Sequence, residues 1–253
     1  MEFKDTTIDL TEIASELVPT EGIIIDSFNS MQENLFLIDR AAPSPDEKEV
    51  VESIPFMNGS YDFSMIFGER FFEDRELTYQ FMLFNSPYSD RKVFETKLKR
   101  KLLPIGITEI YDTHDKDYFW LGKVTRIDVK DNEEMHCLEI EIIIKAHAYM
   151  FRKILEGQDI WDEFMFEYDV AQEVKFNLTS DYKKILLING GQTGVVPKII
   201  VKGRATVEFN NRTYQLNDGQ IKDDRFNLLV GVNELKIKGS GTIEFEFRRK
   251  ELG

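Results

Sequence analysis

Alternation of apolar and polar side chains is the feature that most limits what this chain can fold into. It runs through residues 77–83, 138–145 and 242–248. Successive side chains of a strand point to opposite faces of a sheet, so a period of two over these lengths predicts half-buried β-strands. We therefore expect a mainly β fold.

Two short segments are typical of tight turns between strands. Asn210-Asn211 lies between two strand-like triplets, and Gly239-Ser240-Gly241 precedes the last strand. Both predict hairpin turns, because Asn and Gly tolerate the positive φ that such turns require. The stretch 41–53 is charged and contains two prolines, which predicts an exposed loop.

Two helices are expected among the strands. The longer one is predicted over Asp90–Leu103, with Ser89 or Asp90 as its cap and Pro104 as its stop. A shorter helix is predicted over Asp9–Leu17. The apolar stripe of the longer helix consists of Phe94, Leu98 and Leu102.

The length of 253 residues allows one large domain or two modest ones. Turn signals restart after Tyr149, and the Gly-rich stretch 189–194 opens a new series of strands. We place a boundary near residue 150. This predicts an N-terminal domain over residues 1–150 and a C-terminal domain over residues 151–253.

The chain is acidic, with a formal net charge of −14. This argues against a general nucleic-acid binder, although a ring with an acidic lumen would still let DNA slide through it. Residues 1–50 hold twelve Asp or Glu against three Lys or Arg, a balance of −9. That surface is either a solvated face or a docking surface for a basic partner, such as a neighbouring copy near Lys97–Lys101. In the second case, association should weaken as salt rises.

One acidic cluster could in principle hold a metal. His114 lies among Asp112, Asp115 and Asp117, whose carboxylates are hard oxygen ligands. The cluster lacks the Gly and the distant Glu of an EF-hand loop, so an exposed hairpin turn is the preferred interpretation.

The remaining candidates for chemistry are expected to be structural. His136 and His147 flank one predicted strand without a ligand partner in register, and Cys137 reads as a small buried apolar residue. No catalytic motif is present. We therefore expect no enzyme, no cofactor, no metal site and no internal disulfide. No apolar run is long enough to span a membrane, and the acidic N-terminus does not resemble a signal peptide.

One motif and its surroundings resemble a known family. Residues 54–64 read I-P-x-x-x-G-x-x-D-x-S, and a long strand-like run ends at Phe84. This layout resembles the N-terminal domain of siphophage distal tail (Dit) proteins, of the baseplate-hub type found in lactococcal phages. Stretches 35–48, 90–124, 189–199 and 231–237 are similar to further family segments in the same order.

The resemblance implies a structural virion protein that is made in the host cytoplasm. Residues 1–150 would form a β-sandwich-like domain with one packed helix, and six copies would close a hexameric ring. Residues 151–253 would form a galectin-like β-sandwich. The ring would connect the tail tube protein to the tail-tip protein (tail-associated lysin), hold baseplate or receptor-binding proteins, and leave a channel for DNA.

Two other classes of function are open at this point. A carbohydrate-binding module that contacts the host cell wall is the main alternative. An enzyme is the weakest candidate, because no nucleophile and base occur at a recognisable spacing.

Overall fold

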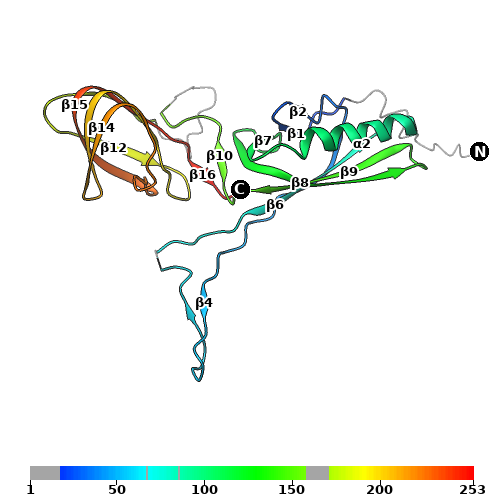
Figure 1. Ribbon diagram of the computed structural model, residues 1–253, viewed down its shortest axis with the longest axis horizontal. Helices are drawn as coiled ribbons and strands as arrows, with labels where there is room; N and C mark the ends of the chain where they lie inside the picture. Colours follow the sequence, from blue (N-terminus) through cyan, green and yellow to red (C-terminus); the bar gives the residue numbers. More distant parts are fainter. Residues whose placement is uncertain (1–17, 67, 85, 158–170) are drawn as a thin grey trace, which may run out of the picture. The chain divides into compact units, whose positions relative to one another are not determined.

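The computed structural model describes residues 18–66, 68–84, 86–157 and 171–253. Antiparallel strands dominate these residues, so the prediction of a mainly β chain is confirmed (Figure 1). The chain divides into two compact units, Met1–Ala148 and Tyr149–Gly253. The short helix expected over Asp9–Leu17 lies outside the described residues.

The first unit is built on one long antiparallel sheet with the strand order β2-β1-β7-β8-β9-β6-β3. Helix α2 (Tyr88–Leu102) lies alongside this sheet and contacts β8 (Figure 1). The strands are β1 (Ile23–Ile25), β2 (Phe28–Asn29), β3 (Phe36–Ala41), β6 (Arg75–Leu83), β7 (Thr108–Asp112), β8 (Tyr118–Asn132) and β9 (Cys137–Ala146).

The alternating sequences form the centre of this sheet. In β6 every second residue is buried, from Arg75 to Leu83, and the residues between them are partly or fully exposed. Leu77 pairs with Ile144 and Phe81 pairs with Ile140 across the neighbouring β9. Burial of each such side chain stabilises the fold by about 1.5–3 kcal/mol.

Helix α2 begins in a different way from the one predicted. Its N-cap is Pro87, with no side-chain cap hydrogen bond, so the prediction of Ser89 or Asp90 as the cap is wrong. Proline suits this position because its fixed φ leads into the helix and its missing N–H costs no helical hydrogen bond. Leu98 and Leu102 of the predicted stripe are buried, whereas Phe94 is only half-buried.

The second unit contains a five-stranded antiparallel sheet with the order β11-β15-β13-β14, and β12 also pairs with β15. Within this unit, β10 also pairs with β16. The strands are β10 (Met150–Arg152), β11 (Lys175–Leu178), β12 (Lys183–Asn189), β13 (Lys198–Phe209), β14 (Arg212–Ile221), β15 (Gly231–Glu246) and β16 (Lys250–Glu251).

The long strands of the second unit curve around its core (Figure 1). Several phenylalanine rings pack together inside a mostly aliphatic core: Phe226 lies 4.8 Å from Phe209 and 6.1 Å from Phe245, measured between ring centroids. All three are buried. These three aromatic side chains are thus used for packing in this unit.

One of the two predicted turns in this unit is confirmed and the other is wrong. Asn210 and Asn211 join β13 to β14 with φ of 48° and 58°. Gly239-Ser240-Gly241 makes no turn, because it lies inside β15 and pairs with β13. A Cβ on Gly239 would lie 1.9 Å from the backbone oxygen of Arg204. These glycines therefore let two long strands bend together without losing their pairing.

We predict that Gly239→Ala destabilises the chain by about 3 kcal/mol or more, because the added Cβ collides with the paired strand. Gly219→Ala is the matched control: its φ of 136° is close to the 147° of Gly239, but no atom lies within 4 Å of the added Cβ. Backbone strain alone should cost the control about 1 kcal/mol. Urea unfolding followed by circular dichroism measures both, and equal losses would contradict the steric explanation.

Candidate functional site

A long hairpin separates β3 from β6 in the first unit. We call residues 43–74 the arm. Its strands β4 (Val51–Glu52) and β5 (Tyr61–Asp62) pair only with each other, apart from the main sheet (Figure 1). Further backbone hydrogen bonds continue the pairing, from Phe63 to Val50 and from Glu73 to Asp46, both at 2.8 Å. The stretch that was expected to be an exposed loop therefore includes one side of this hairpin.

The motif of residues 54–64 forms the tip of the arm. Phe56 and Gly59 take positive φ of 69° and 85° at the turn. Asp62 accepts a hydrogen bond from the backbone N–H of Ser64 at 2.8 Å, and the Ser64 hydroxyl accepts one from the N–H of Val50 at 2.9 Å. The side-chain hydrogen bond with Ser64 lowers the pKa of Asp62. The motif residues thus shape a hairpin and assemble no reactive centre.

The arm exposes much of the apolar surface of the described chain. Of 21 large hydrophobic residues exposed among the described residues, nine lie on the arm. An isolated two-stranded hairpin is marginal in water, and clustered exposed apolar residues mark interaction sites. The nine residues are Val50, Val51, Ile54, Phe56, Tyr61, Phe63, Met65, Ile66 and Phe71.

The two ends of the arm are joined by a buried arginine. Arg75, the first residue of β6, donates a hydrogen bond from Nη2 to the backbone oxygen of Ala42 at 2.7 Å. Its guanidinium carbon lies 4.6 Å from the ring centroid of Trp120. Desolvation lowers the pKa of Arg75. Since a hydrogen bond from a charged donor is stronger than a neutral one, this contact fixes where the arm leaves the sheet.

A second buried group anchors the strand that leads into the arm. Arg40 of β3 donates from Nε to Oδ2 of Asp112 at 2.6 Å, and the Tyr79 hydroxyl donates to the same oxygen at 2.8 Å. Arg40 also pairs with Asp115. Burial raises the pKa of Tyr79 and of Asp115. We call Arg40, Tyr79, Asp112 and Asp115 the root cluster.

The expected hairpin turn in the acidic stretch 112–117 is present between β7 and β8 and exposes His114 and Asp117, but Asp112 at its start is buried in the root cluster. The side chain of Asp112 is 1% exposed, and Arg40 occupies the carboxylates that a metal would need. In the part of the chain that the structure describes, no group of three or more His, Cys, Asp or Glu side chains could hold a metal ion. His114 is exposed, and its backbone N–H donates to Asp112 at 2.8 Å.

The other residues considered for chemistry lie apart along the fold. His136 occupies an exposed turn with φ of 48° and directly precedes β9, so it flanks the strand as expected. Cys137 is buried, and this burial raises the pKa of its thiol. His147 follows β9, and its N–H donates to the backbone oxygen of Leu121 at 2.8 Å.

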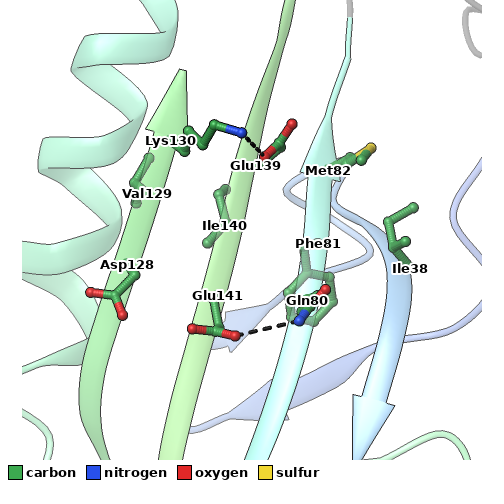
Figure 2. Close-up of a pocket in the computed structure, with 10 residues that line it drawn as sticks. All are labelled: Ile38, Gln80, Phe81, Met82, Asp128, Val129, Lys130, Glu139, Ile140 and Glu141. Carbon is green, nitrogen blue, oxygen red and sulfur yellow. Dashed lines mark hydrogen bonds and ion pairs between the residues drawn. The ribbon is translucent and has the colours of Figure 1, made fainter. Parts of the chain in front are cut away.

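The sheet of the first unit carries a shallow open groove of about 320 Å³. Figure 2 shows two side-chain pairs across neighbouring strands of the groove: Lys130 lies 3.2 Å from Glu139, and Gln80 donates to Glu141 at 3.4 Å. Ile38 and Met82 lie at one side of the groove (Figure 2). An open groove of this kind differs from the enclosed concave sites that usually bind small molecules.

Part of the acidic N-terminal excess is neutralised inside the chain. Glu33 lies 3.8 Å from the Nζ of Lys97 and 3.4 Å from that of Lys101. A contact between the basic end of α2 and the acidic surface of a neighbouring copy was one of the two alternatives, but for Glu33 the contact with this helix is intramolecular. The salt dependence of association for the remaining acidic residues stays a prediction.

No helix of the described part is both long and apolar enough to cross a membrane.

Comparison with known proteins identifies a similar solved structure. No protein-family model and no curated protein matches the sequence. The crystal structure of the Dit protein of phage SPP1, titled a paradigm of hub adsorption apparatus in Gram-positive infecting phages, aligns with a TM-score of 0.62. It has 12% sequence identity, and the alignment covers 90% of this chain and 98% of that chain. The chain has the fold of a phage Dit protein.

The Dit fold confirms the resemblance on which the sequence prediction rested, at the level of architecture. A chain of the phage P2 baseplate, in its activated conformation with Ca, also matches, with 11% identity and a TM-score of 0.37. That alignment covers 86% of this chain and 90% of the other, and its TM-score is too low to support an argument. The sequence drew attention to Asp112 and Asp115 as an acidic cluster, but nothing local pointed to their partner Arg40, which lies 72 residues before Asp112.

We predict that Asp112→Asn destabilises this Dit-fold chain by about 2–4 kcal/mol, because the change leaves the half-buried Arg40 without its nearest opposite charge. Asp117→Asn is the matched control, since Asp117 is exposed in the same turn and should change the free energy of unfolding by less than about 0.5 kcal/mol. Chemical denaturation of both variants decides the matter. Similar stabilities would show that the root cluster contributes little.

Proposed function

We propose that this chain is a structural protein of a phage tail, and that its copies form a closed ring at the distal end of the tail. The observation that carries the proposal is the Dit fold over 90% of the chain. The exposed apolar arm supports it independently, because an arm of this composition needs a protein surface to cover it.

Ring closure is supported by the edges of the first sheet. Its outermost strands are β2 on one side and β3 on the other. Open edges favour uncontrolled pairing, and a closed cyclic assembly covers them by symmetry. We infer that residues 1–150 carry the ring contacts and that six copies close it, with the arm of each copy packed on another copy.

The remaining roles follow from a ring placed at this position. We propose that it joins the tail tube protein to the tail-tip protein and leaves a channel for DNA. The net charge of −14 suits a wall that does not retain the phosphate backbone. The domain over residues 151–253, proposed to be galectin-like, would hold baseplate or receptor-binding proteins. The chain would then reside in the virion.

A scaffold role fits the described residues better than sugar binding or catalysis. Five described phenylalanines of the second unit pack into its core and are not available to stack on a sugar: Phe176, Phe209, Phe226, Phe245 and Phe247. Nothing observed in the described part of the chain favours the carbohydrate-binding alternative. The four residues considered for chemistry serve as turns, core or backbone contacts, which supports a protein without enzymatic activity.

The arm provides the direct test of self-assembly. We predict that the double variant Ile54→Ser and Phe56→Ser weakens ring formation at least tenfold, because it removes apolar contacts at the arm tip. Sedimentation velocity over a rising concentration of the full chain measures the assembly. The melting temperature should not change, since both side chains are exposed.

Val230→Ser is the control, because Val230 is similarly exposed but belongs to the second unit. It should assemble like the unchanged chain. Rings that form equally well in all three proteins would exclude the arm as an assembly contact.

A further inference from the structure

Strand β12 (Lys183–Asn189) has an unpaired side. It pairs with β15 along its whole length, from Lys183 opposite Ile237 to Asn189 opposite Gly231. No other described strand pairs with it. The strand therefore forms an edge of the second sheet over this length.

One side chain shows which backbone groups face outward. Gln172 donates from Nε2 to the backbone oxygen of Ile188 and accepts from its N–H, both at 2.8 Å. In an antiparallel pair the backbone groups of alternate residues point toward the partner strand and away from it. The backbone N–H and C=O groups of Ile188 point away from β15. Those of Leu186 and Lys184, two and four residues earlier, therefore point away from β15 as well.

Gln172 thus imitates a neighbouring strand at one residue and leaves the rest of the edge open. No described residue forms a hydrogen bond with the outward N–H and C=O groups of Lys184 or Leu186. Proteins usually blunt such edges with charges, prolines or a covering segment. Here Gln172 covers the edge at Ile188, and Lys183 and Lys184 lie at its other end, so that the outward backbone groups of Leu186 stay uncovered by any described residue.

Exposed apolar side chains adjoin the open edge. Leu186 is 50% exposed, and Val232, which lies opposite Ile188 on β15, is 66% exposed. Leu229 and Val230 just before β15 are also more than half exposed. An added strand would find both free backbone partners and an apolar surface at the same place.

The charge of residues 171–253, which include this edge, differs from that of the whole chain. Residues 171–253 hold fourteen Lys or Arg and ten Asp or Glu, a balance of +4, whereas the chain as a whole carries −14. Lys183 and Lys184 lie on the edge strand itself. Lys184 pairs with Glu234 at 2.5 Å, and Lys183 lies 5.3 Å from the ring centroid of Phe176. A partner with acidic residues would meet this edge more favourably than a basic one.

We propose that β12 is a docking edge for an extended peptide segment of a second protein. The segment adds to the sheet as a strand, exchanging backbone hydrogen bonds with Leu186 and Lys184. Its apolar side chains lie on Leu186 and Val232, and acidic residues at its ends lie near Lys183. This proposal goes beyond ring formation and does not depend on it, so the failure of either leaves the other standing.

Amide hydrogen exchange on the full chain tests the proposal without any substitution. The probe is the synthetic peptide Glu-Thr-Val-Thr-Val-Thr-Glu with blocked ends, and the control peptide carries Pro at its central position. Exchange of the Leu186 amide should slow at least tenfold with the probe and stay unchanged with the control peptide. The Leu187 amide, which faces β15, should be protected with and without the probe.

Two variants separate backbone pairing from apolar contact. Leu186→Pro removes the outward N–H and should weaken peptide binding at least tenfold, whereas Leu186→Thr keeps the N–H and should weaken it less. If Leu186→Pro does not fold, the exchange data decide alone. Three results would overturn the proposal: equal binding by both variants, a Leu186 amide already protected in the free chain, or an edge that becomes protected by dimerisation without peptide.

Discussion

The buried carboxylate of Asp112 is the group on which the arrangement of the first unit depends. It accepts hydrogen bonds from Arg40 of β3 and Tyr79 of β6, and so ties two strands to the end of β7. A buried carboxylate is stable only when it is paired and hydrogen-bonded, so the three strands hold one another in place. Arg75 completes this arrangement by joining the two ends of the arm.

Two parts of the chain leave groups uncovered that proteins usually cover. The arm exposes apolar side chains such as Phe56 and Ile66, and β12 leaves backbone groups open in the second unit. Both features cost free energy in water and cost less when covered by protein. A chain that is complete only within an assembly accounts for both, and for the absence of a reactive set among the residues considered for chemistry.

Local patterns predicted the elements whose structure is decided locally. Alternation found β6 and β9, and Asn210-Asn211 found its turn, because side-chain period and backbone φ are properties of neighbouring residues. The glycines around Ser240 were read as a turn because the partner strand β13 that makes them a bend is distant in sequence. The turn after Asp112 was predicted correctly, but the burial of Asp112 itself was missed for the same reason, since its partner Arg40 lies 72 residues away. The motif of residues 54–64 indicated a family but not a hairpin. The exposed apolar surface of the arm depends on the pairing of its two strands, which the motif does not contain.

A reconstruction of the phage tail tip tests the central claim most directly. The account predicts six copies of this chain in one closed ring, with the apolar side chains of each arm buried against another copy. A single copy, a threefold or fivefold arrangement, or arms that remain exposed to solvent in the assembled tail would contradict it.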